Sequence, residues 1–368
     1  MCKFNFKTFP GENFANNRLA NRDEFGYSSC MISSPDPQKP VKAVGLLSGG
    51  LDSILAAKII KDLGVEVHGV YFAMPWGCCD KDKALGAASQ LGIDCVVLQL
   101  DERYLEIVKS PKHGYGSAMN PCMDCRVHMF GRAGQYMRSI GADFVFTGEV
   151  LGQRPMSQMR HSMRLIEKES QLQGRLVRPL CAQHLDPTIP EQEGLIDRNK
   201  LLDLSGRTRR PQMDLAAQHQ ITDFLPPAGG CLLTDKNFAR RMKDTLDHGY
   251  RTFRETIGLQ WGRHFRYSNE FKIVLGRDEE ENESLRSYAH IDDFILELPD
   301  KKGPTLILKG NNPDDELLGL CAGMVQQFSS YKDLPEKEVD CWKAGEPGEI
   351  RRIKALKIPD EQIEKMKI

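Results

Sequence analysis

Serines, glycines and an aspartate gather where the first long apolar run of the chain ends. The run 41–47 is followed by Ser48, Gly49, Gly50, Leu51, Asp52 and Ser53, and a helical pattern of apolar residues begins at once. Glycines let backbone approach a ligand, and the first N–H groups of a helix have no internal partners. Hydroxyl donors and a carboxylate that can face a metal ion complete the set. This serine–glycine loop, residues 48–53, predicts a phosphate site, although an ordinary strand–turn–helix corner has the same outline.

Three cysteines form the second group that could carry chemistry. Cys122 and Cys125 lie three residues apart at the start of a predicted helix, so they share one face, and Cys231 follows two glycines. Thiolates suit zinc and iron–sulfur clusters. Structural zinc nearly always has four ligands, so three cysteines leave an open, reactive position. Zinc with His113 or His128 as a fourth ligand remains an alternative.

The elements that must position these groups alternate between strand and helix. Strands are expected at 41–47, 65–72, 95–100 and 143–146, and helices at 82–91 and 123–140. This alternation predicts an α/β fold, a parallel sheet with helices on both faces. Ligands of such sheets bind at the carboxyl ends of the strands. We therefore expect the serine–glycine loop and the segment Thr147-Gly148-Glu149 to face one crevice.

The motif Ser-Gly-Gly-x-Asp-Ser after an apolar strand resembles that of the PP-loop pyrophosphatases. It differs from the phosphate loop that ends in Gly-Lys-Ser/Thr, because the lysine is absent. The resemblance implies binding of ATP with Mg²⁺, adenylation of a substrate oxygen and release of pyrophosphate. It implies that the nucleotide is held by Ser48, Gly49, Gly50, Asp52, Ser53, Thr147 and Gly148, with Asp52 also catalytic.

A longer segment narrows the resemblance. Thr-Gly-Glu-x-x-Gly-Gln from Thr147, then Ser157-Gln158 and Arg178-Pro179-Leu180, is similar to the tRNA 4-thiouridine synthetases, although the spacing before Ser-Gln differs by about one residue. These enzymes place sulfur on uridine 8 of tRNA. The implied partners are tRNA and a sulfur donor, either sulfide or a cysteine desulfurase. Gln153, Ser157 and Gln158 are candidates for the substrate side of the site.

The resemblance also implies a role for the three cysteines. The cluster-dependent branch of tRNA thiolases has Cys-x-x-Cys plus one distant cysteine, which makes Cys122, Cys125 and Cys231 ligands of a 4Fe–4S cluster whose open iron binds sulfide. Other tRNA thiolases use such cysteines as a persulfide relay without a cluster, in which low-pKa thiols act as nucleophiles. Both roles make the three cysteines catalytic residues, and zinc remains the third alternative.

Several alternatives for the function stay open. About 40 residues before Val41 cannot hold the ferredoxin-like segment and THUMP domain typical of 4-thiouridine synthetases, which leaves position 8 in question. A 2-thiouridine synthase acting at the wobble position is the nearest alternative. A PP-loop enzyme acting on a small molecule, or a non-enzymatic RNA-binding adaptor that senses ATP, would share the serine–glycine loop.

The expected domains are an extended arm over 1–40, the PP-loop domain over 41–235, a helical connector over 236–268 and an α+β domain over 269–368. The last contains Gly-Arg-x-x-x-x-Asn-Glu from Gly276, which resembles the RNA-binding NFACT-R module, and ends in a basic tail after Arg351. A basic cluster, Arg207-Thr208-Arg209-Arg210, could contact phosphate or simply be exposed.

Composition excludes some classes of protein. The chain has 368 residues and a formal net charge of −1, so it is not a globally basic nucleic-acid binder. No apolar run approaches the ~20 residues that span a bilayer, and no membrane partner is expected. The 11 cysteines and the absence of an export signal predict a cytoplasmic protein with free or metal-bound thiols. A homodimer is compatible with the sequence.

Overall fold

The computed structural model describes residues 40–74, 76–77, 80–100, 102–226, 230–249 and 252–368. The expected N-terminal arm, apart from Pro40, lies outside the described residues, and so does the pair Cys78-Cys79. Cys181, Cys321 and Cys341 are buried, as small apolar side chains of the core commonly are, and Cys95 is half-buried.

The first sheet is parallel throughout. Its order is β3 (Asp94–Gln99), β2 (Glu66–Ala73), β1 (Lys42–Leu46), β4 (Phe144–Phe146) and β5 (Leu176–Val177). Each neighbouring pair runs in the same direction. The central strands β1 and β4 are apolar because both of their faces are buried. The expected α/β fold is confirmed.

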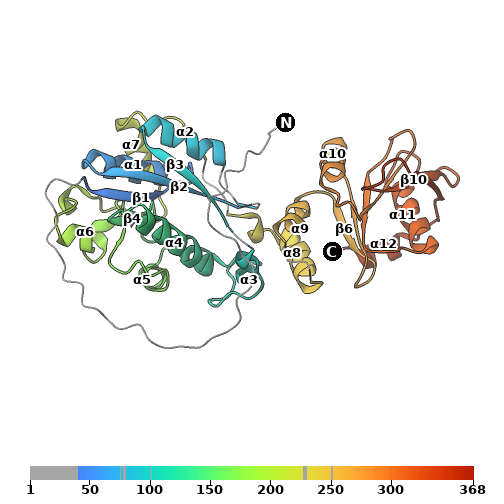
Figure 1. Ribbon diagram of the computed structural model, residues 1–368, viewed down its shortest axis with the longest axis horizontal. Coiled ribbons are helices and arrows are strands. Elements are labelled where there is room, and N and C mark those ends of the chain that lie inside the picture. The colour runs from blue at the N-terminus through green and yellow to red at the C-terminus, as the bar shows by residue number, and fades with distance from the viewer. Residues whose placement is uncertain (1–39, 75, 78–79, 101, 227–229, 250–251) are drawn as a thin grey trace. The chain divides into compact units, whose positions relative to one another are not determined.

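Helices cover both faces of this sheet (Figure 1). One core contains Phe144 and Phe146 with residues of α1 (Leu51–Asp62), α2 (Lys81–Leu91) and α7 (Arg210–Gln218). The opposite core contains Val145 with residues of α3 (Arg103–Lys109), α4 (Cys122–Ser139) and α5 (Arg160–Glu169). Successive strand side chains alternate between the two cores, as the pleat requires.

The stretch between β5 and residue 235 contains more helical structure than its prolines suggest. It holds α6 (Ile189–Gln192) and α7, with short 3-10 turns at Ala182–His184, Arg198–Lys200 and Leu232–Thr234. The expected helical connector begins with α8 (Lys236–Asp247) and α9 (Phe253–Ile257), which continues into a 3-10 turn, Gly258–Gln260. Apolar residues of α8 join the core that contains α4.

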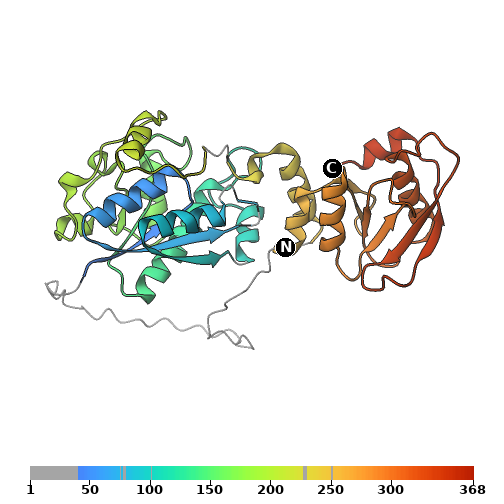
Figure 2. The ribbon, with the colours of Figure 1, turned by 90° about the horizontal axis from the view of Figure 1, so that it is seen from above.

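The second sheet is antiparallel (Figure 2). Its order is β11 (Arg351–Lys354), β10 (Glu338–Lys343), β8 (Phe294–Glu297), β9 (Leu306–Lys309), β7 (Lys272–Leu275) and β6 (Arg263–Arg266). Helices α11 (Asp315–Gln327) and α12 (Asp360–Met366) pack on one face, and α10 (Glu279–Tyr288) packs on the other. The expected small α+β domain is present, but the basic stretch after Arg351 forms strand β11 rather than a tail.

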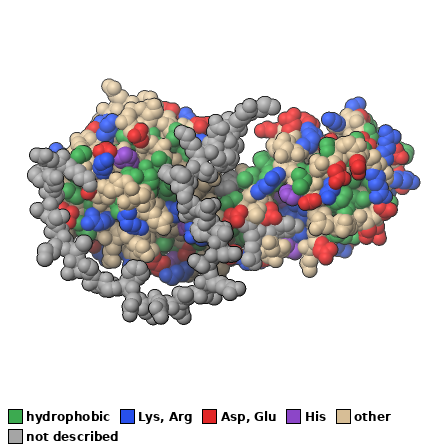
Figure 3. Space-filling model, in the orientation of Figure 1, with side chains coloured by type: hydrophobic (Ala, Val, Ile, Leu, Met, Phe, Trp, Pro, Cys, Tyr) green, Lys and Arg blue, Asp and Glu red, His purple; other side chains and the backbone are tan. Residues whose placement is uncertain are grey.

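The described surface carries both signs of charge. Lys and Arg side chains alternate with Asp and Glu over the face shown in Figure 3, which agrees with the formal net charge of −1. Among the described residues, no helix is long and apolar enough to cross a bilayer.

Candidate active site

The serine–glycine loop joins β1 to α1 and is held by its own serines. Gly49 has φ of +75°, a conformation that favours glycine. The Gly50 N–H donates to Ser48 Oγ at 3.3 Å, and Ser53 Oγ donates to the Gly50 carbonyl at 2.8 Å. Within the described residues no side chain caps α1, whose N-cap is Gly50. The loop thus presents the uncapped, positive end of a helix dipole, which suits an anion.

Gly148 brings the loop after β4 against this corner. A Cβ atom at position 148 would lie 2.4 Å from the carbonyl oxygen of Asp52 and 2.6 Å from the amide nitrogen of Ser53. Only glycine permits so close an approach of two backbone segments. The serine–glycine loop and the Thr147–Gly148 segment therefore meet at the carboxyl edge of the sheet, between β1 and β4, where the strand order reverses direction.

Asp52 is the charged centre of this corner. Gln153 Nε2 donates to Asp52 Oδ2 at 3.1 Å, whereas buried Oδ1 has no hydrogen-bond partner among the described residues. Burial raises the pKa of the Asp52 carboxyl, and the hydrogen bond from Gln153 and the positive charges of Arg209 and Arg154 offset only part of this effect. A carboxylate oxygen held without a protein partner can accept a metal ion or a bound donor.

Arg209 and Gln212, at the start of α7, are site residues that the sequence did not single out individually. Gln212 is 1% exposed, and its side chain lies close enough to Asp52 to lower the pKa of that carboxyl, but neither amide atom reaches full hydrogen-bond geometry with a described residue, and neither does the buried Nε of Arg209. The segment reaches the crevice because the Gly206 N–H donates to the Leu151 carbonyl at 2.8 Å. The only sequence signal was the basic cluster 207–210.

Glu149 and Arg178 form a second buried charge group beside the first. Arg126 Nη1 lies 2.6 Å from Glu149 Oε1, and Arg178 Nε lies 3.0 Å from Oε2. Arg178 also pairs with Glu167 at 3.0 Å and donates to the Met163 carbonyl at 3.2 Å. The Arg-Pro-Leu and Thr-Gly-Glu motifs are thus joined by a hydrogen-bonded ion pair that fixes the loop carrying Gly148.

The structure brings the three cysteines close to one another around Tyr104. Cys122 and Cys125 open helix α4, and the negative charges that Cys122 and Cys231 can carry both raise the pKa of Cys125. Burial has the largest effect and raises the pKa of Cys125 to about 12, although a hydrogen bond from Tyr104 lowers it. Burial also raises the pKa of Tyr104, with smaller effects from the three cysteines.

Backbone hydrogen bonds connect the segment of Cys231 to both sites. Its beginning pairs with the serine–glycine loop, because the Leu225 N–H donates to the Gly49 carbonyl at 2.9 Å. Its end pairs with the loop after β2, because the Leu232 N–H donates to the Trp76 carbonyl at 3.1 Å. The Met119 N–H then donates to the Leu233 carbonyl at 3.1 Å, just before Cys122.

The cysteines do not form a metal site in this geometry. Among the described residues, no group of three or more His, Cys, Asp or Glu side chains is arranged to hold a metal ion. His113, a candidate fourth ligand for zinc, instead pairs with Glu169 through Nε2 at 3.0 Å. The donor set has the softness that iron and zinc prefer, so a cluster or zinc held by these cysteines remains a proposal.

Two family models match the chain. Residues 41–173 match the model described as "tRNA methyl transferase HUP domain". The first domain is a HUP domain of the PP-loop type. Residues 262–366 match the model described as "NFACT protein RNA binding domain". The HUP domain thus carries the serine–glycine loop, Gly148 and the first two cysteines, whereas Cys231, Arg209 and Gln212 lie beyond its matched residues.

Curated relatives match part of the chain. The chain is 35% identical over 113 residues to the tRNA-specific 2-thiouridylase MnmA of Sulfurimonas denitrificans, covering 28% of this chain and 33% of the relative. It is 30% identical over 137 residues to the protein of the same name from Thermus thermophilus, covering 31% of this chain and 37% of the relative. The chain therefore spans about a third of the length of these relatives.

Solved structures give weaker likenesses. A 4-thiouridine synthetase–RNA complex with bound ATP aligns with 49% of this chain and 50% of its own, at 21% identity and a TM-score of 0.31. The C-terminal part of the fibronectin/fibrinogen-binding protein from Streptococcus suis aligns with 37% of this chain and 64% of its own, at 21% identity and a TM-score of 0.27.

Proposed function

We propose that this protein is an ATP-dependent tRNA sulfurtransferase that adenylates a uridine and replaces its carbonyl oxygen with sulfur. One observation carries the proposal. The segment containing Cys231 pairs with the serine–glycine loop through Leu225 and with the loop after β2 through Leu232, so a nucleotide corner and a group of three thiols share one edge of one sheet. The RNA-binding domain and the relatives named 2-thiouridylases support a tRNA substrate.

The proposed reaction has two steps. The uridine oxygen attacks the α-phosphate of ATP, an O–P bond forms and pyrophosphate leaves. Sulfide then attacks the activated carbon, a C–S bond forms, the C–O bond breaks and AMP leaves with the former carbonyl oxygen. The protein's part in the first step is to position phosphates and stabilise charge. The uncapped start of α1 supplies backbone donors at that corner, where the Ser48 hydroxyl donates to Ser53 Oγ and the Ser53 hydroxyl donates to the Gly50 carbonyl.

Asp52, Arg209 and Gln212 are assigned to the polyphosphate. The unbonded Oδ1 of Asp52 suits Mg²⁺, which supplies charge neutralisation when ATP is bound. Arg209 and Gln212 offer donors beside Asp52. We expect Arg209→Ala to raise the KM for ATP in pyrophosphate release at least tenfold, with Arg240→Ala, an exposed arginine of α8, as the matched control. An unchanged KM would remove Arg209 from the site.

The three cysteines are assigned to sulfur handling. As cluster ligands, Cys122, Cys125 and Cys231 would hold a 4Fe–4S cluster that presents sulfide, and a persulfide relay or zinc are the other assignments for the same residues. Anaerobic purification with iron and sulfide analysis separates them, since only the cluster gives a brown protein with both elements. Cys231→Ala should abolish thiolation and leave pyrophosphate release intact, whereas Cys95→Ala on β3 should leave both. Thiolation by the Cys231→Ala protein would contradict the assignment.

The modified atom is proposed to be O4 of uridine 8, from the motifs around Thr147 and Arg178. The curated relatives favour the second candidate, 2-thiouridine at the wobble position. Nucleoside analysis of tRNA from a deletion strain decides between them. Loss of 4-thiouridine supports the first candidate, and loss of 2-thiouridine with 4-thiouridine intact supports the second.

A further inference from the structure

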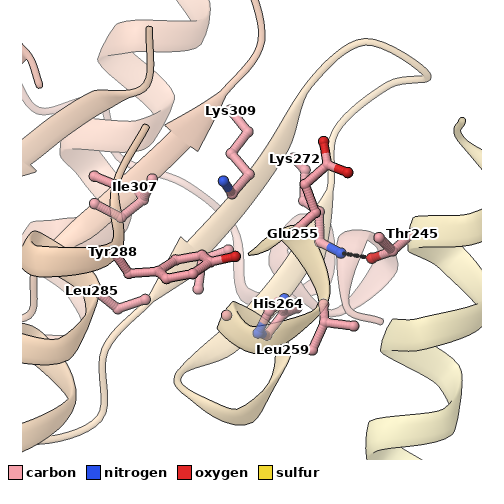
Figure 4. Close-up of a pocket in the computed structure, with 12 residues that line it drawn as sticks. Thr245, Glu255, Leu259, His264, Lys272, Leu285, Tyr288, Ile307 and Lys309 are labelled. Atoms are coloured by element: carbon pink, nitrogen blue, oxygen red, sulfur yellow. Dashed lines mark hydrogen bonds between the residues drawn. The ribbon is translucent and has the colours of Figure 1, made fainter. Parts of the chain in front are cut away.

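Two hollows of the molecule differ in what they can hold. Figure 4 shows a cavity on the α10 side of the second sheet, bordered by His264, Tyr288 and Lys309. Its volume of about 20 Å³ has room for one water molecule, so it is part of the packed core rather than a ligand site. A groove on the surface of the first domain has a volume of about 300 Å³, which lies within the range of ligand sites in proteins.

This groove, the α4 groove, is lined by α4 residues between Val127 and Arg138, by Arg103 and by residues 169–171. His128, Gln135 and Arg138 are separated by seven and three residues, intervals that return to the same side of a helix. The other wall comes from the first residue of α3 and from the end of α5 with the turn after it. The groove therefore follows the axis of α4.

Three guanidinium groups give the α4 groove its charge. Arg103 opens α3, and Arg132 and Arg138 lie about 9 Å apart along the axis of α4. Arg103 and Arg138 are exposed and Arg132 is half-buried, so a ligand can reach them from solvent. An arginine side chain presents a planar fork of N–H donors that fits phosphate oxygens. The groove thus suits a ligand that carries several phosphates in a row.

Glu169 supplies the one carboxylate among the described residues that line the groove, and cations outside the lining compensate its charge. Lys112 Nζ lies 2.6 Å from Glu169 Oε1, and His113 Nε2 lies 3.0 Å from Oε2. The hydrogen bonds from Lys112 and His113 lower the pKa of Glu169. Because both of its oxygens are engaged in this way, Glu169 opposes an anion in the groove less than a carboxylate without partners would.

One end of the α4 groove lies beside the three cysteines. His128 follows Cys125 by three residues, which is about 4.5 Å along the axis of α4. The rings of His128 and Tyr104 lie 5.9 Å apart between centroids, and Tyr104 is the residue that hydrogen-bonds to Cys125. Arg138, at the other end, is about 20 Å from Cys125 along the same axis. A strand that follows the groove would therefore end at the thiols.

We propose that the α4 groove binds the phosphate backbone of the RNA strand that leads to the reacting uridine, an inference that rests on the tRNA substrate of the proposed function. Phosphate contacts fix the register of a bound strand and carry no sequence information, so the groove sets which nucleotide reaches Cys125. An acidic protein partner fits less well. Among the described lining residues Val127 alone is aliphatic, whereas the buried centre of a protein interface is apolar and rich in aromatic residues.

The test measures binding of an unmodified tRNA transcript to the full chain at several salt concentrations, without ATP or a sulfur donor. Each phosphate contact that is lost should reduce the slope of log K against log salt concentration by about 0.7–0.9. We expect Arg138→Gln and Arg103→Gln each to show this reduction and to weaken binding about tenfold at low salt. Both side chains are exposed, so the fold should be kept. Arg240→Gln, at an exposed arginine of α8, is the matched control and should change neither quantity.

Calorimetry with inorganic phosphate separates an RNA strand from a free anion. Phosphate alone should bind weakly, with a Kd above about 1 mM, and tight binding of phosphate that Arg138→Gln removes would replace the strand with a free anion. Unchanged affinity and salt slope in both groove variants would overturn the proposal and favour an acidic protein partner. Thiolation by a chain whose groove variants bind tRNA normally would refute this inference alone. Binding through the groove without any modification of the tRNA would refute only the proposed function.

Discussion

Two charge clusters of the first domain, one around Glu149 and one around Asp52, differ in how completely they are hydrogen-bonded. In the first, both carboxylate oxygens of Glu149 are bonded to guanidinium groups, and Arg178 has further partners in Glu167 and Met163. In the second, Asp52 Oδ1, Arg209 Nε and both amide atoms of Gln212 have no hydrogen-bond partner among the described residues. A buried polar group without a partner is costly, so the second cluster fits a bound ligand, and the first is scaffold.

The largest effect should come from breaking the bonded cluster. Arg178→Met removes the charge that pairs with Glu149 and Glu167 and leaves the buried Glu149 carboxylate with Arg126 as its remaining charged partner. We expect a loss of about 3–5 kcal/mol in the free energy of unfolding, measured by urea denaturation. A loss below about 1 kcal/mol would show that the cluster is not structural.

Gly148→Ala should have an intermediate effect and act on both clusters. The added methyl group meets the Asp52 carbonyl at 2.4 Å, so two backbone segments must separate. We expect a loss of about 1–3 kcal/mol in the free energy of unfolding, by the same denaturation. Weakened ATP binding should accompany it, measured by calorimetry. Gly86→Ala on α2, where a Cβ meets nothing within 4 Å, is the control and should not destabilise.

The pH dependence of stability in the Asp52→Asn variant tests the unbonded cluster. Burial raises the folded-state pKa of Asp52 above its ordinary 3.8, so the folded state binds a proton more tightly than the unfolded state. This stabilising contribution is complete below pH 3.8 and is lost as the pH rises through the raised pKa. The variant has no such loss. We therefore expect its stability relative to the natural protein to increase from acid to neutral pH, in denaturation curves at several pH values. A pH-independent difference would contradict the raised pKa.

The smallest effect should come from an ion pair outside both clusters. Arg164 and Asp186 lie 2.7 Å apart, but their side chains are 63% and 75% exposed. We expect Arg164→Ala to change the free energy of unfolding by less than about 1 kcal/mol, and added salt to reduce even that. A larger effect would show that the solvent exposure of an ion pair does not predict how much that pair stabilises this domain.

Local patterns predicted much of the fold. The expected strands at 65–72, 95–100 and 143–146 coincide with β2, β3 and β4 within about two residues, because apolar runs between glycines mark buried parallel strands. The serine–glycine loop and Gly148 were expected at one crevice because parallel strands end on one edge. The second sheet was only partly predicted. Strand β6, Arg-His-Phe-Arg, buries Phe265 and His264 between two arginines. Because the arginines interrupt the apolar pattern, the sequence did not indicate a strand there.

The unbonded cluster could not be predicted, because its members come from separate parts of the chain. Gln153 follows β4, and Arg209 and Gln212 open α7, after two short helices and several turns. No periodicity relates position 52 to position 212. Arg207–Arg210 could be seen as basic, but only the bridge between Leu151 and Ser205 places Arg209 at the crevice. The ion pair between Glu149 and Arg178 could not be predicted either, because the two residues are distant in the sequence, although each belongs to a motif.

The hydrogen bonds that fix Cys231 also set an order in time. Cys122 and Cys125 emerge from the ribosome with α4, whereas Cys231 is made only after β4, β5 and α7, and its neighbours Leu232 and Leu233 must then pair backwards with Trp76 and Met119. Contacts of such long sequence separation form late in folding. Cys231 is therefore the last of the three thiols to be synthesised, and the three-thiol group depends on hydrogen bonds between segments that are far apart in the sequence.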